Sequence, residues 1–451
     1  MVNLTFYGGA GQIGGNKFLL EDKGVKIYFD FGQSFTFGED YFYEWLQPRS
    51  ANGIEVYFEF GMLPRVTKLY SKDMLELTNL KYQKPDVDAV FISHSHSDHT
   101  GNLNFIDESI PVYMGHCTHK IVETYKKLYG SIIDIGNHDY HIFKSGDKIK
   151  IKHVEVQPIH VDHSVPGAYG FIIKTSKGNI VYTGDFRMHG ARSDLTGDFI
   201  RKSAAAKPIA MLCEGTRVTS EVDHNFTEAE VETKVDEIIT NSKGLVFGHF
   251  SMTNVDRFMS FYRSAVKNKR IMIVDTKFAY ILENLREHIP IIPDVRTDKN
   301  IKVYFRIAKS CKFNEKDYAV WEREYMNNMI TYKEIAKKPA EYVMHMRFAA
   351  LIEMVYIQPK KADFIYSSSE HFYEGEENEA ERTIWQNWMN HFGITFHKAH
   401  CSGHASKEDL FNAVKKINPK KLIPIHTQAP EEYKHVHKNV IIVKGNDKIE
   451  M

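Results

Sequence analysis

The chain has 451 residues, so we expect two domains or one domain with a large insertion, because single cores rarely grow beyond about 250–300 residues. Hydrophobic residues make up 43% and charged residues 26%, which is typical of a soluble globular protein. The 58 basic residues equal the 58 acidic ones, so overall charge does not indicate a nucleic-acid partner, and any basic surface must be local.

Cysteine usage and the absence of long apolar runs indicate where in the cell the protein is expected. The four cysteines are far apart and form no C-x-x-C pair, which favours reduced thiols and a cytoplasmic location: Cys117, Cys213, Cys311 and Cys401. The first residues lack a charged segment followed by a long apolar run, so we expect no signal peptide. No apolar stretch approaches about 18 residues, so we expect no membrane span.

A glycine-rich stretch, residues 8–16, follows the first apolar run. Its glycines fit the G-x-G-x-x-G spacing of dinucleotide-binding proteins. Residues 17–20 continue as another strand, however, so no helix begins there to hold a phosphate group. We therefore predict a β-hairpin. The next strand, residues 25–29, ends at Asp30, whose carboxylate could orient a metal-bound histidine or water.

The long connection formed by residues 34–85 is rich in aromatic residues and carries Arg49, Arg65 and Lys68. Aromatic side chains interleaved with basic ones can stack on bases. They can also form a small core, which is the more common outcome. Both interpretations stay open at this point.

The stretch from Phe91 to Gly101 contains three histidines and one aspartate within six positions: His94, His96, Asp98 and His99. If the chain is still extended at the first two histidines, their side chains point to the same side. The other two residues then lie where the chain turns, so all four groups can converge. Imidazole nitrogens and a carboxylate suit zinc and similar divalent metals. A solvated polar turn is the alternative, which this spacing at a strand end disfavours.

This motif resembles the signature of the metallo-β-lactamase superfamily, whose members usually hold two metal ions. The resemblance implies further ligands at later strand ends. His163, which precedes Ser-x-Pro, matches the next ligand, whereas His160 is better interpreted as a structural histidine. Asp185, at the end of the strand-like run 179–186, matches the ligand that bridges the two ions.

The pattern changes after residue 216. Thr227 and Glu230 form a potential capping box before a helix, and strands and helices then alternate. Such alternation predicts a small parallel sheet covered by helices. We expect three segments: a first domain over 1–216, an inserted domain over 217–370, and a return to the first domain over 371–451, with strands at 394–396 and 440–443. The acidic run 374–381 is expected to be a solvated helix start.

This organisation resembles the β-CASP group of the superfamily, in which an acidic residue and two late histidines complete the site; here these are Glu214, His404 and His426. The similarity is greatest to the ribonuclease J family, through Ser367-Ser368-Ser369, Ser402-Gly403-His404-Ala405-Ser406 and Pro424-Ile425-His426. The expected fold is α/β: a metallo-β-lactamase αββα sandwich with an inserted α/β β-CASP domain. The chain departs from the family at Thr427-Gln428, where Gly-Glu is frequent. The family's carboxy-terminal domain is also expected to be absent.

The resemblance implies two divalent metal ions, with zinc expected and manganese or magnesium as alternatives. The ligands would form two sets that share Asp185: His94, His96 and His163 for one ion, and Asp98, His99 and His426 for the other. A water shared by the ions would attack phosphorus in line. Asp98 would also orient that water, and His404, held by Glu214, would protonate the leaving 3′ oxygen. The alternative for His404 is an ordinary turn histidine.

A histidine at position 426 resembles the RNA-acting members of the group, whereas the DNA-repair members tend to have valine there. Residues 250–257 open a helix and resemble the family's phosphate-binding loop, although serine or threonine at such a place is more often a helix cap. The predicted phosphate-binding residues are Ser251, Thr253, Asn254, Ser368, Ser402, Gly403 and Ser406.

The sequence thus predicts a cytoplasmic, metal-dependent ribonuclease that acts on single-stranded RNA in RNA decay and maturation. It would release nucleotides 5′-to-3′ from 5′-monophosphorylated RNA, alongside internal cleavage, as a homodimer without membrane association. A β-CASP DNA nuclease and a small-molecule thioester or lactam hydrolase are the alternatives. The second has no use for the insertion and the late histidines. A non-catalytic subunit is disfavoured because every ligand is retained.

Overall fold

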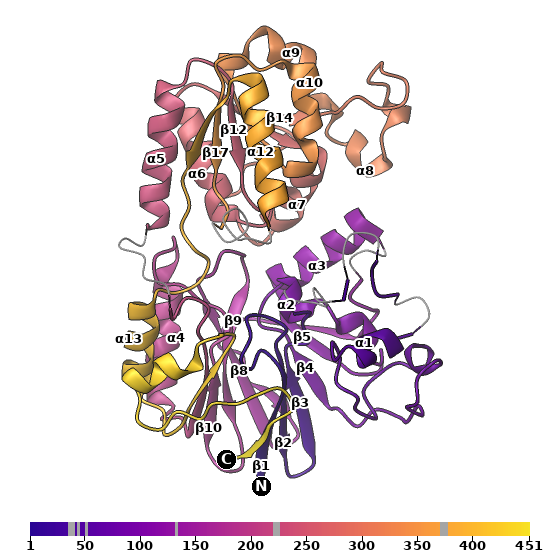
Figure 1. Ribbon diagram of the computed structural model, residues 1–451, viewed down its shortest axis with the longest axis vertical. Helices are drawn as coiled ribbons and strands as arrows, with labels where there is room; N and C mark the ends of the chain where they lie inside the picture. Colours follow the sequence, from indigo (N-terminus) through magenta and orange to yellow (C-terminus); the bar gives the residue numbers. More distant parts are fainter. Residues whose placement is uncertain (35–40, 43–45, 50–52, 131–133, 220–225, 370–377) are drawn as a thin grey trace. The chain divides into compact units, whose positions relative to one another are not determined.

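The computed structural model describes residues 1–451 except 35–40, 43–45, 50–52, 131–133, 220–225 and 370–377. The chain forms two compact units (Figure 1). The first consists of Met1–Met188, Arg192–Val222 and Gly403–Met451, and the second of His189–Ala191 and Asp223–Ser402. The second unit is therefore an insertion in the sequence of the first.

The first unit contains two β-sheets. One has seven strands, in the order β20 (Lys448–Glu450), β1 (Val2–Gly8), β2 (Lys17–Asp22), β3 (Val25–Phe29), β4 (Ala89–Phe91), β5 (Val112–Gly115) and β6 (Tyr140–Phe143). The other has six, in the order β19 (Leu422–Ile425), β11 (Ala210–Glu214), β10 (Asn179–Tyr182), β9 (Ala168–Lys174), β8 (Val154–Val161) and β7 (Ile149–Ile151). The expected hairpin at the glycine-rich stretch is confirmed, because β1 and β2 pair antiparallel.

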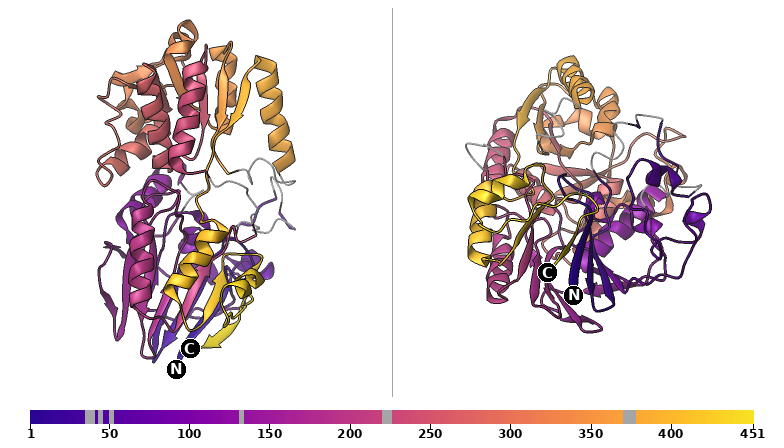
Figure 2. Two further views of the ribbon diagram at one scale, coloured as in Figure 1. Left: turned by 90° about the vertical axis from the view of Figure 1, so that its left-hand side faces the viewer. Right: turned by 60° about the horizontal axis from the view of Figure 1, so that its bottom comes forward.

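The alternation of side chains along the strands explains how the two sheets pack. Alternate residues Val2, Leu4 and Phe6 of β1 enter a core that also contains Phe171 and Leu212 of the other sheet. The outer face of the first sheet packs against α3 (His116–Tyr129), and that of the second against α4 (Ser193–Ala205) and α13 (Lys407–Ile417). Figure 2 shows α4 and α13 on that outer face. The predicted αββα sandwich is confirmed.

The second unit contains a seven-stranded sheet in the order β15 (Met329–Ile330), β14 (Ile301–Tyr304), β13 (Ile271–Asp275), β16 (Tyr342–His345), β12 (Val246–His249), β17 (Asp363–Tyr366) and β18 (Thr395–Lys398). All neighbouring strands pair in parallel, as the alternating pattern predicts. Its longer helices are α5 (Glu228–Asn241), α6 (Val255–Lys267), α7 (Thr276–Arg286) and α12 (Glu379–Phe392). The capping box of Thr227 and Glu230 is formed at the start of α5.

The structure differs from the sequence-based expectations in two places. The strand expected at 394–396 exists as β18, but it pairs with β17, so the second unit extends to Ser402 and not to residue 370. The segment 440–443 makes only an isolated bridge to β19, and the last strand is β20, which pairs with β1. The turn between β7 and β8 contains Lys152, which adopts a left-handed φ of 55°.

The aromatic-rich connection contributes to a core where it is described. Tyr57 and Phe58 of α1 (Glu55–Glu59) are buried in the same cluster as strands β3, β4 and β5. Tyr43 and Trp45 lie outside the described residues, as does the acidic run up to residue 377. Among the described residues, no helix is long and apolar enough to cross a membrane.

Candidate metal centre

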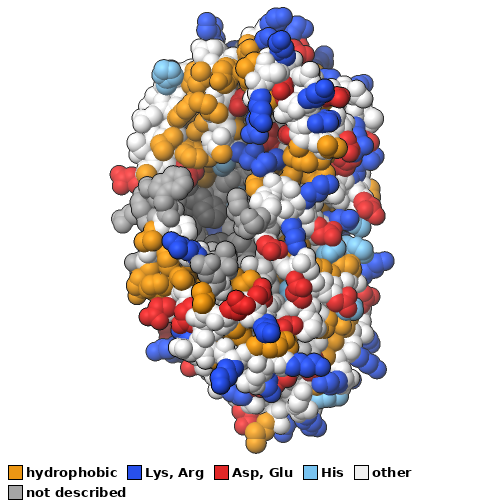
Figure 3. All heavy atoms as spheres, turned by 90° about the vertical axis from the view of Figure 1, so that its right-hand side faces the viewer, with side chains coloured by type: hydrophobic (Ala, Val, Ile, Leu, Met, Phe, Trp, Pro, Cys, Tyr) orange, Lys and Arg blue, Asp and Glu red, His pale blue; other side chains and the backbone are white. Residues whose placement is uncertain are grey.

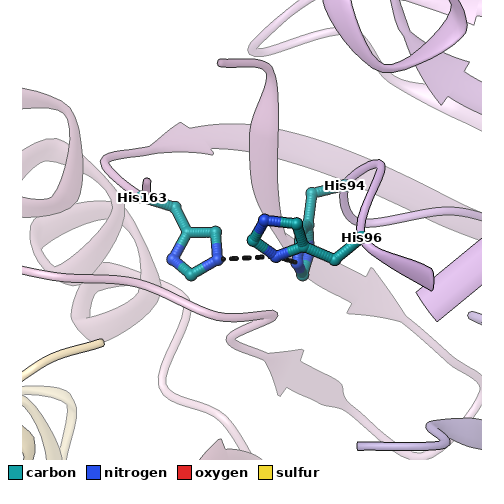
Figure 4. Close-up of side chains that lie close together, drawn as sticks. All are labelled: His94, His96 and His163. Atoms are coloured by element: carbon teal, nitrogen blue, oxygen red, sulfur yellow. Dashed lines mark hydrogen bonds between the residues drawn. The ribbon is translucent and has the colours of Figure 1, made fainter. Parts of the chain in front are cut away.

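Three of the histidines singled out in the sequence meet at the ends of two strands of the first unit. His94 and His96 follow β4, and His163 follows β8. The Nε2 atoms of His94 and His163 lie 3.0 and 3.2 Å from Nδ1 of His96. Figure 4 shows the three rings turned toward one another. One nitrogen of each ring therefore faces a common point, as the ligands of one ion must.

A second cluster adjoins the first and is completely buried: Asp98, His99, Asp185 and His426. Nε2 of His426 lies 2.9 Å from Oδ2 of Asp98, and Nε2 of His99 lies 3.1 Å from Oδ2 of Asp185. The same Asp185 oxygen is 3.7 Å from Nε2 of His94. Asp185 thus lies between the two groups of histidines, where a carboxylate can serve both.

Hydrogen bonds at the opposite ring nitrogens fix the orientation of these histidines. Nδ1 of His99 lies 2.7 Å from Oδ2 of Asp30, the carboxylate at the end of β3. Tyr182 donates a short hydrogen bond to that same oxygen, and the backbone N–H of Ser93 donates to the other one. Asp30 is therefore held by two further groups. It turns Nε2 of His99 toward the second cluster, as a carboxylate behind a metal-bound histidine does.

Two further orienting groups were not identified from the sequence. The Nδ1–H of His163 donates to the carbonyl of Gly403 at 2.6 Å, and Nδ1 of His426 lies 2.7 Å from Oγ1 of Thr216. Thr216 lies just after the end of β11, and this position at a strand end could have identified it from the sequence. The Gly403 carbonyl carried no such signal, because any residue type has one.

Burial and neighbouring charges give the first histidine cluster and the two aspartates the protonation states of metal ligands. Burial, followed by the neighbouring histidines, lowers the pKa of His94 and of His163 well below its ordinary value, and burial lowers that of His96 to about 4. Burial alone would raise the pKa of Asp98 and Asp185, but the surrounding histidines outweigh it and lower both well below the ordinary range. Neutral imidazoles and ionised carboxylates are the forms that bind divalent cations. His99 differs: burial would lower its pKa, but the charges of Asp185, Asp98 and Asp30 raise it well above its ordinary value.

The unpaired oxygens of the two aspartates test whether this donor set fits metal ions. Among the described residues, Oδ1 of Asp98 and Oδ1 of Asp185 are buried and accept no hydrogen bond. A buried carboxylate oxygen without a partner is costly, by about 1–3 kcal/mol or more for a charged group. Cations between the carboxylates and the converging imidazoles would satisfy both oxygens. The residues present therefore fit a pair of divalent ions.

A histidine and a glutamate lie beside the second cluster. Nδ1 of His404 is 3.3 Å from Oε1 of Glu214 and 3.9 Å from Oδ2 of Asp185. Glu214 is fully buried, and its carboxylate also accepts the N–H groups of Phe186 and Thr216. Burial would lower the pKa of His404, but the charge of Glu214 outweighs it and raises the pKa to about 9. The side chain of His404 is 21% exposed, so a protonated imidazole stands at the edge of the centre.

Two of these strand-end residues adopt left-handed backbone conformations, with φ of 58° at Asp30 and 51° at His426. Such conformations cost about 1–3 kcal/mol per non-glycine residue and persist only where neighbours impose them. The carbonyl of Phe91 accepts the N–H of Asp30 at 2.8 Å, and the carbonyl of Gly9 accepts the N–H of His426 at 2.6 Å. The glycine-rich loop thus supports a ligand through its backbone.

A buried ion pair joins the two loops that carry His163 and Asp185. Nε of Arg187 lies 3.1 Å from Oδ1 of Asp162, and the backbone N–H of Arg187 donates to the Asp162 carbonyl at 2.8 Å. Arg187 is fully buried and Asp162 is 3% exposed. The hydroxyl of Thr196 receives the Asp162 N–H and donates to the Arg187 carbonyl, so it links the same two loops. This pair fixes the relative position of two ligands.

The predicted phosphate-binding residues are divided between the two units. Five lie in the second: Ser251, Thr253, Asn254, Ser368 and Ser402. Gly403 and Ser406 lie in the first. Asn254 accepts the N–H of Arg257 and caps α6, and Ser406 accepts the N–H of Asp409 and caps α13. The hydroxyls of Ser251 and Thr253 lie 3.0 Å apart just before α6.

Two family descriptions match parts of the chain. Residues 71–206 match the β-lactamase superfamily domain, and residues 395–441 match the Zn-dependent metallo-hydrolase RNA specificity domain. The first segment carries the ligands from His94 to Asp185, and the second carries His404 and His426. The second match begins at β18, the last strand of the inserted unit, and continues into the first unit, so the two matches together cover most of the candidate centre.

Curated relatives and a solved structure extend this similarity. Ribonuclease J 2 of Streptococcus pyogenes is 26% identical over 394 residues, covering 83% of this chain and 67% of the relative. Ribonuclease J of Helicobacter pylori is 22% identical, covering 100% of this chain and 61% of the relative. The chain thus spans about three fifths to two thirds of the length of these relatives.

The crystal structure of a protein of unknown function from Enterococcus faecalis V583 shares the fold, with a TM-score of 0.78 and 22% identity over 99% of both chains. The αββα sandwich, the inserted parallel sheet and the two domain matches agree with the resemblance seen in the sequence. These matches and relatives together support a ribonuclease J-like protein, with similarity to the β-CASP group of the metallo-β-lactamase superfamily.

Proposed function

We propose that this protein is a metal-dependent ribonuclease that hydrolyses phosphodiester bonds of single-stranded RNA. The observation that carries the proposal is the pair of ligand clusters sharing Asp185, with the His404–Glu214 pair beside them. The match of residues 395–441 to an RNA specificity domain and the similarity to ribonucleases J support RNA as the substrate. A small-molecule hydrolase would not need the late histidines.

The division of labour among the residues follows from their contacts. His94, His96 and His163 would hold one divalent ion, and Asp98, His99 and His426 the other, with Asp185 shared. When bound, the ions lower the pKa of water and stabilise negative charge on a phosphoryl group, and zinc is the expected metal. Asp30, Thr216 and the Gly403 carbonyl keep the histidine rings in place.

His404 is the residue assigned to protonate the leaving group. Because Glu214 raises its pKa to about 9, the imidazole is protonated at neutral pH and stands within reach of a group at the second cluster. A leaving 3′ oxygen needs a proton as the phosphorus–oxygen bond breaks. Asp98, which lies in the second cluster, is also assigned to orient the attacking water.

We expect the His404→Ala variant to turn over RNA about 10²- to 10⁴-fold more slowly, because general acids typically contribute this much. Its metal content should stay close to that of the wild type, since His404 is assigned to the leaving group and not to a metal ion. His391→Ala, which removes an exposed histidine of α12, is the matched control. Loss of one metal ion in His404→Ala would mean that the roles of His404 and His426 are reversed.

For the direction of cleavage, we propose 5′-to-3′ release of nucleotides from RNA bearing a 5′ monophosphate, alongside internal cleavage. The hydroxyls of Ser251 and Thr253 at the start of α6 support this, because helix N-termini and hydroxyl groups bind terminal phosphates. Ser368 and Ser402, which belong to the same unit, are further proposed contacts.

The test compares 5′-monophosphate, 5′-triphosphate and 5′-hydroxyl forms of one RNA, labelled at the 3′ end, together with single-stranded DNA of the same sequence. The protein is assayed with zinc or manganese. We expect the monophosphate to be degraded fastest, with shortening from the 5′ end. Equal rates on the three RNAs, or products that shorten from the 3′ end, would overturn the direction. If single-stranded DNA is turned over faster than RNA, the substrate class is DNA and not RNA.

A further inference from the structure

The second unit carries a group of basic side chains at one edge of its sheet. Lys277, Arg306 and Arg347 follow the carboxyl ends of β13, β14 and β16. These three strands are neighbours, in the order β14, β13, β16, and all are parallel. Each of the three residues stands two positions after the last residue of its strand, and neighbouring strands lie about 4.8 Å apart. The topology therefore brings the three cationic groups to the same edge.

The charges of Arg347 and Arg306 affect the pKa of Lys277. Burial and then the positive charge of Arg347 lower the pKa of Lys277, and Arg306 adds to the effect. Asp275 binds Arg347 through two hydrogen bonds of 3.0 and 2.6 Å, and Glu322 accepts the hydroxyl of Thr276 at 2.7 Å. The loop after Arg306 adds two exposed lysines, Lys309 and Lys312, and the acidic residues Glu315 and Asp317 follow it. Three cationic groups are therefore concentrated at the ends of three neighbouring strands.

An aromatic pair lies beside this basic edge. Trp321 of α8 (Val320–Arg323) packs on Tyr280 of α7, with ring centroids 5.2 Å apart, and both rings are partly exposed. The hydrogen bond from Thr276 to Glu322 joins the start of α7, where Lys277 lies, to α8. Figure 3 shows the face on which α8 lies in Figure 1, where basic side chains are mixed with hydrophobic ones. Cations next to aromatic rings are the combination that binds single-stranded nucleic acids.

The same edge of the sheet carries the segments discussed for phosphate binding. Ser251–Asn254 follow β12 and Ser367–Ser369 follow β17, and these strands continue the sheet beyond β16. From β12 the chain crosses β16 to reach β13, whereas from β16 it crosses β12 to reach β17. The direction of the connections therefore reverses between β12 and β16. Ligands of open parallel sheets bind outside the carboxyl ends at such a reversal. The edge therefore runs from hydroxyl groups at β17 and β12 to cations at β16, β13 and β14.

We propose that the carboxyl edge of this sheet binds the sugar-phosphate backbone of single-stranded RNA through Lys277, Arg306 and Arg347, which we call the basic edge, with Trp321 stacking on a base. This inference rests on the proposed function, because it assumes an RNA substrate. It adds a second contact area that acts on the body of the strand and not on its 5′ end. It explains how a chain with no net charge holds a polyanion.

The test measures binding without cleavage, in the presence of a chelator, with a long unstructured fluorescent RNA over a range of salt concentrations. The double variant Lys277→Ala/Arg306→Ala leaves Arg347 in its pair with Asp275. We expect it to bind about ten-fold more weakly, with a salt slope smaller by about 1–1.5, because single strands release about 0.7 counterions per phosphate contact. The matched control is Lys243→Ala/Lys360→Ala, two exposed lysines at the amino ends of β12 and β17.

Further variants separate charge and stacking from folding. Lys277→Arg/Arg306→Lys keeps both charges and should bind like the wild type. Trp321→Ala should weaken binding with an unchanged salt slope. If the double alanine variant binds like the control, or if it loses affinity for a mononucleotide as much as for the long RNA, the basic edge is not a backbone site. If the protein does not hydrolyse RNA when metal is added, the proposed function is wrong, even if the protein binds RNA in the presence of the chelator.

Discussion

The Asp185→Ala variant should lose RNA hydrolysis almost completely, by at least about a thousand-fold, because it removes the carboxylate that both ligand clusters share. His99 would lose its 3.1 Å contact and His426 its 3.6 Å contact with the same oxygen. The remaining histidines would repel one another more strongly once protonated. We therefore expect a lower metal content as well as lower activity, measured by elemental analysis of the purified protein.

The control is Asp139→Ala, which removes an aspartate whose side chain is 77% exposed and lies 3.0 Å from Nε2 of His141. It should leave metal content and activity unchanged. His96→Ala tests the other cluster and should give the same double loss, since Nδ1 of His96 is the atom nearest to both His94 and His163. Near-wild-type cleavage by Asp185→Ala at saturating metal would contradict the shared centre.

The Lys17→Met variant should be more stable than the wild type at pH 7, by about 2–4 kcal/mol. Lys17 is 3% exposed, and burial lowers its pKa from 10.5 to about 7. Its amine donates one hydrogen bond of 3.2 Å, to the Gly15 carbonyl, and lies 5.8 Å from the Phe31 ring. A shift of this size corresponds to a destabilisation of about 5 kcal/mol, which the lost hydrogen bond and packing changes in the variant partly offset.

The pH dependence of this effect has a definite sign. Because the folded-state pKa lies below the unfolded-state value, the unfolded chain binds more protons between pH 7 and 10.5, and the stability of the wild type rises over that range. The advantage of Lys17→Met should be full below pH 7 and shrink toward pH 10.5. Urea unfolding at several pH values measures it, with Lys150→Met, an exposed lysine of β7, as control. A variant less stable than the wild type at pH 7 would contradict this.

Much of the candidate centre could be predicted because its ligands stand at strand ends. The apolar run before His94 and the strands ending near Asp185 and His426 place side chains at the same edge of two sheets, and the structure brings these residues together. Glu214 and His404 are likewise adjacent. Whether each residue has its proposed role stays a prediction, which the variants above decide.

Features that depend on tertiary pairing could not be predicted. The residues 394–396 predict a strand, but only the pairing of Thr395 with Asp363 and its neighbours shows that it joins the inserted sheet. The Gly403 carbonyl and the Gly9 carbonyl act through the backbone, so their residue types give no sign of the contacts they make. The Asp162–Arg187 pair is similar, because neither residue is unusual in its own segment.

The arrangement of the centre along the chain has a consequence for its assembly during synthesis. Asp98 and His426 are hydrogen-bonded although they are 328 positions apart, and the whole inserted unit lies between Glu214 and His404. A nascent chain that has not reached residue 426 lacks one candidate ligand, His426, which also lies beside the proposed proton donor, His404. Contacts this distant also form late, because closing such a loop costs entropy before the contact repays it. A ribosome-bound intermediate therefore carries the first histidine cluster as an incomplete site, and hydrolytic capacity arises only when the last β-strands dock.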